Sequence, residues 1–319
     1  MTGQRTAVPA ESAASGAATI GITIGALAVS TTGVFVALAQ APTVVSTFYR
    51  CALAVPVLVA VAWWETRRNG LLDRREAWLA IACGVFFAAD MFLWGTAVLE
   101  AGAGLTTVLV NVQVVVVPLV AYLVDRELPG RRMVFALPVM VVGLIAASGV
   151  LQQGTTGHNP MLGAVHAILA GVCYSGFLFL LRRSGRQGRT MQTYAIAIVI
   201  PALAGLGWGL LRGLSSTLHV DGPALGWLAL TALTGQGIGW LLIARYSHRV
   251  PSGVNATLLL LTPVGALLLG AVILGERPAL LQIVGSALIL AAAYGVSVRR
   301  EATSAPQPIS AEEPARSNR

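Results

Sequence analysis

Ten runs of about 20 apolar residues follow one another along the chain, and this feature constrains the fold more than any other. A helix needs roughly 20 consecutive apolar residues to cross a bilayer. Inside the bilayer every backbone polar group must be satisfied within the protein, which favours helices. We therefore predict an all-α integral membrane protein with ten transmembrane helices. The predicted spans are residues 18–39, 44–64, 77–98, 104–124, 132–150, 160–181, 191–211, 224–244, 253–274 and 279–298.

The composition agrees with this reading. Charged residues make up 11% of the chain, whereas a soluble domain carries about 25%. The polar residues 1–17 and 299–319 are predicted to be disordered cytoplasmic tails. The first span also resembles a signal peptide, with Ala37-Leu38-Ala39 before Gln40. We interpret it as a retained helix, because its apolar stretch is longer than a usual signal core.

The arginines predict the orientation. They cluster in short loops between the apolar runs, which marks the cytoplasmic side of a membrane protein rather than a nucleic-acid partner. With the N-terminus inside, fifteen loop arginines lie inside and only Arg212 and Arg277 lie outside. We predict that both termini are cytoplasmic. The use of arginine alone suits a bacterial genome rich in G and C, so we expect a bacterial plasma membrane.

The chain has no lysine, because all 21 basic residues are arginine. A Walker A loop and the Schiff base of pyridoxal phosphate or retinal each require a lysine. An ATP-hydrolysing P-loop pump and a rhodopsin are therefore excluded. We expect no cofactor, and the dispersed histidines and cysteines give no metal site.

The two halves of the chain correspond when one is shifted by 149 residues. This shift places Glu127 on Glu276 and Pro129 on Pro278, so both halves carry a Glu-x-Pro turn. Because each half has five helices, the second half must enter the membrane upside down. We predict inverted repeats over residues 18–150 and 160–298, an architecture typical of secondary transporters.

The second half also carries a recognisable motif. A helix proline, Pro263, is followed by a Gly275-Glu276 turn and by Gly285 in the last helix. With Arg50 and Ser252-Gly253, this pattern resembles the EamA-like ten-helix branch of the drug/metabolite transporter superfamily. The first half fits more loosely, since Val114 stands where Pro263 is expected and the nearest proline is Pro118. The resemblance implies a central cavity and transport of small metabolites, but it does not define a substrate.

Polar residues inside the spans are the candidate site. Asp90 lies mid-span, where a charge costs about 2.5–3.5 kcal/mol, so we expect it to couple protons or to contact a substrate amine. The alternative is a neutral or paired aspartate that locks two helices together. Arg50 is its candidate partner, and it either binds a substrate carboxylate or reaches the headgroups. Trp94 lies one turn from Asp90 on the same face.

Further polar and aromatic residues complete the candidate set. They are Asn111, Tyr174, Ser175, Gln236, Trp240 and Asn255. Helical spacing predicts that Thr107 and Asn111 share one face, that Gln113 points elsewhere, and that Asn255 and Thr262 share another face. Each could instead be an interhelical hydrogen bond worth about 0.6 kcal/mol. Glu127 and Glu276 are interpreted as caps of the helices that follow them.

We expect a secondary transporter that moves an amino acid or a similar amphipathic metabolite, by export rather than uptake. Its partners are a small-molecule substrate, the lipid bilayer and a proton as the candidate coupling ion; the sequence leaves the oligomeric state open. An uptake permease of the same family is the near alternative. A membrane-embedded lipid-modifying enzyme and a channel or scaffold are alternatives from other classes, and no acidic or histidine cluster of the kind that such enzymes use is present.

Overall fold

The computed structural model describes residues 10–101, 103–128, 130–147, 150–153, 159–186, 188–212, 218–275 and 278–297. Within these ranges the chain is helical and has no strand. The elements are α1 (Ala10–Ala39), α2 (Thr43–Asn69), α3 (Arg74–Ala101), α4 (Ala103–Val110), α5 (Gln113–Asp125), α6 (Arg131–Ala147), α7 (Val150–Gln153), α8 (Pro160–Arg186), α9 (Thr190–Arg212), α11 (Gly222–Thr231), η1 (Ala232–Gly239), α12 (Trp240–Tyr246), η2 (Ser247–Arg249), α13 (Ser252–Leu259), α14 (Leu261–Ile273) and α15 (Leu280–Ser297).

The helices confirm the prediction of an all-α membrane protein. Among the described residues, eight helical segments are long and apolar enough to cross a membrane. The segments of the fifth and tenth predicted spans, α6 and α15, are shorter. α1 begins at Ala10, eight residues before the predicted span, because the stretch before residue 18 is rich in alanine, the strongest helix former. The predicted tail 299–319 and the Glu276 turn lie outside the described residues.

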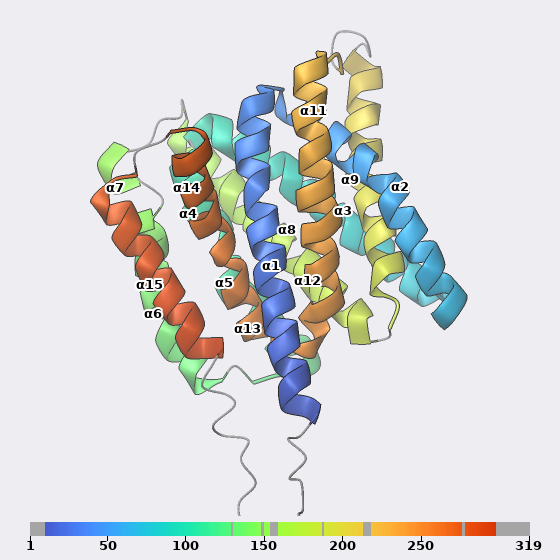
Figure 1. Cartoon of the computed structure of the whole chain (residues 1–319), viewed down its shortest axis with the longest axis horizontal. Coiled ribbons are helices and arrows are strands. Elements are labelled where there is room, and N and C mark those ends of the chain that lie inside the picture. Colours follow the sequence, from blue (N-terminus) through green and yellow to red (C-terminus); the bar gives the residue numbers. More distant parts are fainter. Residues whose placement is uncertain are drawn as a thin grey trace, which may run out of the picture.

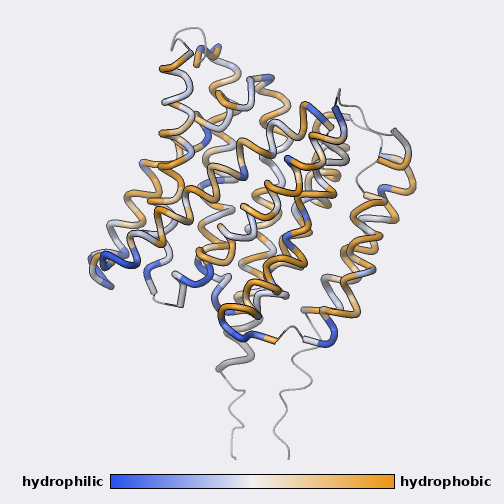
Figure 2. Tube along the Cα trace, turned by 180° about the vertical axis from the view of Figure 1, so that it is seen from behind, coloured by the Kyte–Doolittle hydropathy of each residue, from blue (hydrophilic) through white to orange (hydrophobic). Residues whose placement is uncertain are grey.

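The helices form one bundle with α1 in its middle (Figure 1). α6 and α15 lie side by side at one edge, and α2 lies beside α9 at the other. The described start of α1 and the end of α15 are at the same end of the bundle, the lower end in Figure 1. Figure 2 shows hydrophobic residues along the middle of the helices and hydrophilic residues gathered at helix ends and loops. This distribution is expected of helices that share a bilayer.

Glycines allow α1 to pack closely against η1. A Cβ atom on Gly25 would lie 2.8 Å from the Gly239 carbonyl oxygen, and one on Gly235 would lie 2.3 Å from the Thr32 hydroxyl. Small residues at such crossings let helix backbones approach, which is a main source of packing energy in membranes. The Thr31 and Thr234 hydroxyls, 2.7 Å apart, add a hydrogen bond across the same contact.

A second glycine contact joins α6 to α15. A Cβ atom on Gly285 would lie 2.4 Å from the Ala147 backbone nitrogen and 2.5 Å from the Gly143 carbonyl oxygen. Met140, Ile289 and other apolar residues of this pair form a buried cluster with Leu260. The pair is therefore attached to the rest of the bundle through α13 and α14.

Two of the long apolar spans are interrupted near their middle. Between α4 and α5, the Asn111 and Val112 nitrogens donate to carbonyls three residues earlier, and between α13 and α14 the Leu260 nitrogen does the same. Such tight turns are of the 3₁₀ type and mark breaks in an α-helix. Leu260 and Asn111 are 149 residues apart, which is the shift that aligns the two halves of the sequence.

Candidate functional site

A cavity of about 300 Å³ lies in the bundle between α1, α2, α3, the α4–α5 break, α8, η1, α12 and α14. Seven of the nine residues predicted from the sequence line it. They are Arg50, Asp90, Trp94, Asn111, Tyr174, Gln236 and Trp240. These residues come from both halves of the chain, so the cavity exists only when the halves are packed together.

Arg50 and Asp90 bring opposite charges to the wall of this cavity. Arg50 lies on α2 and is 8% exposed, and its Nε has no hydrogen-bond partner. Asp90 lies on α3. The two described side chains form no direct ion pair within 4.0 Å, but they are close enough to interact electrostatically. Both groups line the cavity, so a ligand there can contact the two together.

Aromatic rings form one side of the cavity. Trp240 meets the ring of Phe177 edge-on at 5.0 Å and that of Tyr174 at 6.0 Å between centroids. Phe87 stacks on Phe177 at 4.2 Å, so the cluster joins α3, α8 and α12. Trp94, one turn from Asp90, adds a further ring to the lining. The arrangement offers an apolar surface beside an acid, which suits an amphipathic ligand.

The η1 segment, a π-helix, presents Gln236 to the cavity. Its sequence holds Gly235, Gly237 and Gly239, and π-turns occur often at functional sites. Tyr194 of α9 is fully buried and donates its hydroxyl to the Gln236 backbone carbonyl at 2.9 Å. The same hydroxyl lies 3.3 Å from the Gln236 side-chain oxygen. Tyr194 thus holds the Gln236 amide at the cavity wall.

The α4–α5 break corrects the expected direction of Gln113. Helical spacing predicts that Gln113 faces away from Asn111, but both residues line the cavity together with Thr107. The prediction is wrong because it assumes a continuous helix, whereas the chain turns at Asn111 and Val112. The break between α13 and α14 has the same effect, since it separates Asn255 from Thr262.

Two predicted residues are not among those that line the cavity. Ser175 is fully buried and donates its hydroxyl to the Gly171 carbonyl on its own helix at 2.6 Å. Asn255 is 1% exposed, and neither atom of its side-chain amide has a hydrogen-bond partner in the described chain. Thr262, rather than Asn255, reaches the cavity from this helical segment.

Sequence reasoning assigned no site residue to α1, yet α1 forms part of the wall. Ser30, Thr32 and Gly33 line the cavity, and the Thr32 hydroxyl is buried without a partner. The run Ser30-Thr31-Thr32 inside an apolar span was the available signal. Phe87 and Met91 on α3 were also missed, because an apolar residue on a membrane helix carries no sign of facing a cavity.

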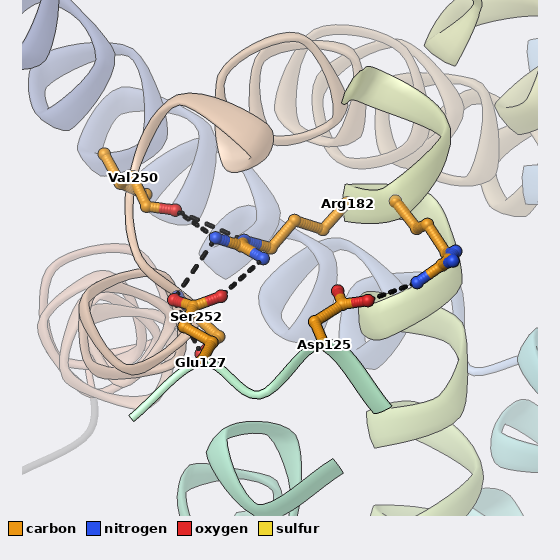
Figure 3. A network of polar contacts seen from close by, with 6 residues as sticks. Asp125, Glu127, Arg182, Val250 and Ser252 are labelled. Carbon is orange, nitrogen blue, oxygen red and sulfur yellow. Dashed lines mark hydrogen bonds and ion pairs between the residues drawn. The ribbon is translucent and has the colours of Figure 1, made fainter. Parts of the chain in front are cut away.

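A polar network joins α8, the α5–α6 connection and the start of α13 (Figure 3). Arg182 of α8 forms an ion pair with Glu127 at 3.0 Å and donates to the Val250 carbonyl at 2.9 Å. Glu127 also accepts from the Ser252 backbone nitrogen at 2.9 Å. Since α6 begins four residues after Glu127, the expected cap of the following helix is in fact bound to the start of α13.

This network lies away from the cavity along the helix axes. Arg182 follows Tyr174 by eight residues on α8, which is about 12 Å at 1.5 Å per residue. Next to it, Arg183 pairs with Asp125 at the end of α5. The two ion pairs therefore tie α8 to the α5–α6 connection, and Arg182 ties both to the start of α13.

Comparison with known proteins gives a consistent result. The EamA-like transporter family matches residues 17–149 and again residues 161–298. The uncharacterized transporter YcbK of Bacillus subtilis (strain 168) is 25% identical over 185 residues, which are 55% of this chain and 57% of YcbK. The match thus spans less than two thirds of that relative.

A solved structure described only as a crystal structure of a protein has the same fold. It superposes with a TM-score of 0.76 and 18% identity, and the match covers 91% of this chain and 99% of that one. The family match covers most of the chain and confirms the resemblance drawn from Pro263, Gly285 and their neighbours. The chain is a multi-pass membrane protein and belongs to the EamA-like transporter family.

Proposed function

We propose that this chain is a secondary transporter that exports a small zwitterionic metabolite, an amino acid or a compound of similar chemistry, across the bacterial plasma membrane. The observation that carries the proposal is the cavity in which Arg50 and Asp90 face the same space without pairing with each other. A ligand with a carboxylate and an amine satisfies both charges, and each charge-assisted hydrogen bond contributes about 1.5–3 kcal/mol.

The aromatic wall favours a ligand with an apolar part. Trp240, Tyr174 and Phe87 line the cavity beside the charged groups. An apolar side chain gains about 25 cal/mol for each Å² that it buries against them. An amine near the face of Trp94 gains a further cation–π interaction. These features support amphipathic amino acids over small sugars or inorganic ions.

Alternating access follows from the proposed inverted repeats, residues 18–150 and 160–298. The equivalent helix breaks at Asn111 and Leu260 support this organisation, and so does the double match to the family. Two similar halves of opposite orientation can exchange conformations, which gives two states of similar energy. With both termini in the cytoplasm, the Arg182–Glu127 network is the closed cytoplasmic gate of the state described here.

Transport into everted membrane vesicles tests the proposal. Vesicles with the wild-type chain should accumulate the exported amino acid, and counterflow should show saturable, stereoselective exchange. Asp90→Asn should alter the dependence of transport on the proton gradient, because Asp90 is the one carboxylate among the described residues that line the cavity. Asp221→Asn, which changes a carboxylate outside that lining and keeps an acceptor for the Ala224 nitrogen at the start of α11, is the control. A wild-type pH profile for Asp90→Asn would exclude Asp90 as the coupling group.

A further inference from the structure

A second cavity, of about 270 Å³, lies apart from the proposed transport path. It is formed by the end of α2, the start of α9 and the end of α12 with η2. Three arginines line it: Arg68, Arg245 and Arg249. No carboxylate of the described chain forms an ion pair with any of the three. This differs from Arg182, Arg183 and Arg189 nearby, which all have acidic partners.

Among the described residues that line this cavity, the one carboxylate, Glu65, is already engaged. Glu65 is buried and accepts hydrogen bonds from the Met191 and Gln192 backbone nitrogens, at 3.2 and 2.9 Å. Its charge therefore stabilises the N-terminus of α9, where a carboxylate interacts favourably with the helix dipole. Glu65 also interacts electrostatically with Arg245, but three arginines against one carboxylate leave the described lining with an excess of positive charge. Arg68 and Arg249 in particular are available to bind an anion.

The aromatic residues place this cavity at the depth of the lipid headgroups. Trp63 and Trp64 on the last turns of α2 are half exposed or more, as expected at a membrane interface. The Arg68 guanidinium lies 3.8 Å from the Trp64 ring centroid, and this stacking orients it at the cavity. Arg249 lies 5.4 Å from the Tyr246 ring centroid. The anion most available at this depth is the phosphodiester of a phospholipid.

We propose that this cavity is a binding site for the headgroup of an anionic phospholipid, with Arg68, Arg245 and Arg249 holding the phosphodiester. Guanidinium groups bind phosphate oxygens in a bidentate manner. Basic pockets between membrane helices on the cytoplasmic side are suited to such headgroups. The site joins α2, α9 and α12, so a bound lipid would hold these three helices together. The proposal requires a membrane but does not depend on the transported compound.

Native mass spectrometry of the full chain, delipidated in a neutral detergent, tests this site. Dioleoyl-phosphatidylglycerol should bind one to one and more tightly than dioleoyl-phosphatidylcholine. Arg68→Gln and Arg249→Gln should each weaken phosphatidylglycerol binding about fivefold, because an arginine near an anionic surface is worth about that factor. The double variant should abolish the preference over phosphatidylcholine. The Arg68 and Arg249 side chains are exposed, so both variants should fold. Thermal unfolding of each variant verifies this.

Arg67→Gln is the matched control. Arg67 lies on the same turn of α2 and stacks on Trp63 at 4.2 Å, but it does not line the cavity. Its replacement should leave phosphatidylglycerol binding unchanged. An equal loss in Arg67→Gln and Arg68→Gln would overturn the proposal in favour of diffuse surface charge. Competition by millimolar inorganic phosphate would overturn it in favour of a site for soluble anions.

Discussion

Replacing Glu127 by glutamine should open the proposed cytoplasmic gate. Glu127 contacts Arg182 at 3.0 and 3.4 Å, and the side chains are 22% and 6% exposed. Glutamine keeps one acceptor, but its amide nitrogen faces guanidinium donors. The loss of a charge-assisted bond costs about 1.5–3 kcal/mol. Arg182 keeps its hydrogen bonds to the Val250 carbonyl, so we take the loss of free energy in the closed state as about 2 kcal/mol. A loss of this size shifts the ratio of open to closed states roughly 30-fold.

A cysteine in the cavity reports this shift. Thr262 lines the cavity, so Thr262→Cys is placed in a chain whose Cys51, Cys83 and Cys173 are replaced by alanine. A membrane-impermeant maleimide then labels everted or right-side-out vesicles. Glu127→Gln should speed labelling from the cytoplasmic side by up to about 30-fold and slow labelling from the outside. Unchanged labelling from both sides would refute the reasoning.

Two further variants separate gating from structural damage. Asp125→Asn removes the pair to Arg183, whose side chain is 38% exposed; such a pair is worth about 0–1 kcal/mol, so labelling should change less than about fivefold. The double variant with Arg182→Gln and Glu127→Gln leaves no buried charge unpaired. It should recover thermal stability while keeping the fast cytoplasmic labelling. Recovery of slow labelling in the double variant would contradict the assignment of the pair as a gate.

Three other substitutions have defined outcomes. Trp240→Leu removes a ring that lines the cavity; a contact between this ring and an aromatic substrate would be worth about 0.5–1.5 kcal/mol, so counterflow should show KM rising more for aromatic than for aliphatic substrates. Gly285→Ala should lower the melting temperature in detergent, since overpacking costs about 1–3 kcal/mol, whereas Gly295→Ala, with open space around its Cβ position, should not. Tyr194→Phe leaves the Gln236 carbonyl without its donor, at a cost of about 1–3 kcal/mol, and should weaken transport and stability together; an unchanged melting temperature would contradict this.

The positions of the helices were predictable because apolar length is a local property of the sequence. All ten predicted spans coincide with helical segments, even where α6 and α15 are short. The start of α1 was placed eight residues too late, because the alanines before residue 18 favour a helix although that stretch is polar. The family was also predictable, because the run from Pro263 to Gly285 is specific.

The geometry of the site was predictable only in part. Asp90 and Trp94 were correctly placed on one face because α3 is continuous. Gln113 was misplaced because a break in the helix depends on what packs against it: the Val110 carbonyl at this break lies 2.5 Å from a Cβ built on Gly171. No pattern within one span reveals such a contact. The partner of Glu127 was missed for the same reason, since Ser252 is 125 residues away.

The wide turn of η1 has a consequence for insertions and deletions in this chain. A π-turn holds one residue more than an α-turn, so the loss of a single residue between Ala232 and Gly239 would restore ordinary helix geometry without breaking the span. Because the wide turn absorbs the extra residue, α11 and α12 would keep their orientation relative to each other, and only the residues inside the turn would change position. Gln236, which lies inside the turn and lines the cavity, would then be displaced relative to Trp240. The length of this segment, and not only its composition, therefore sets the position of Gln236 in the cavity wall.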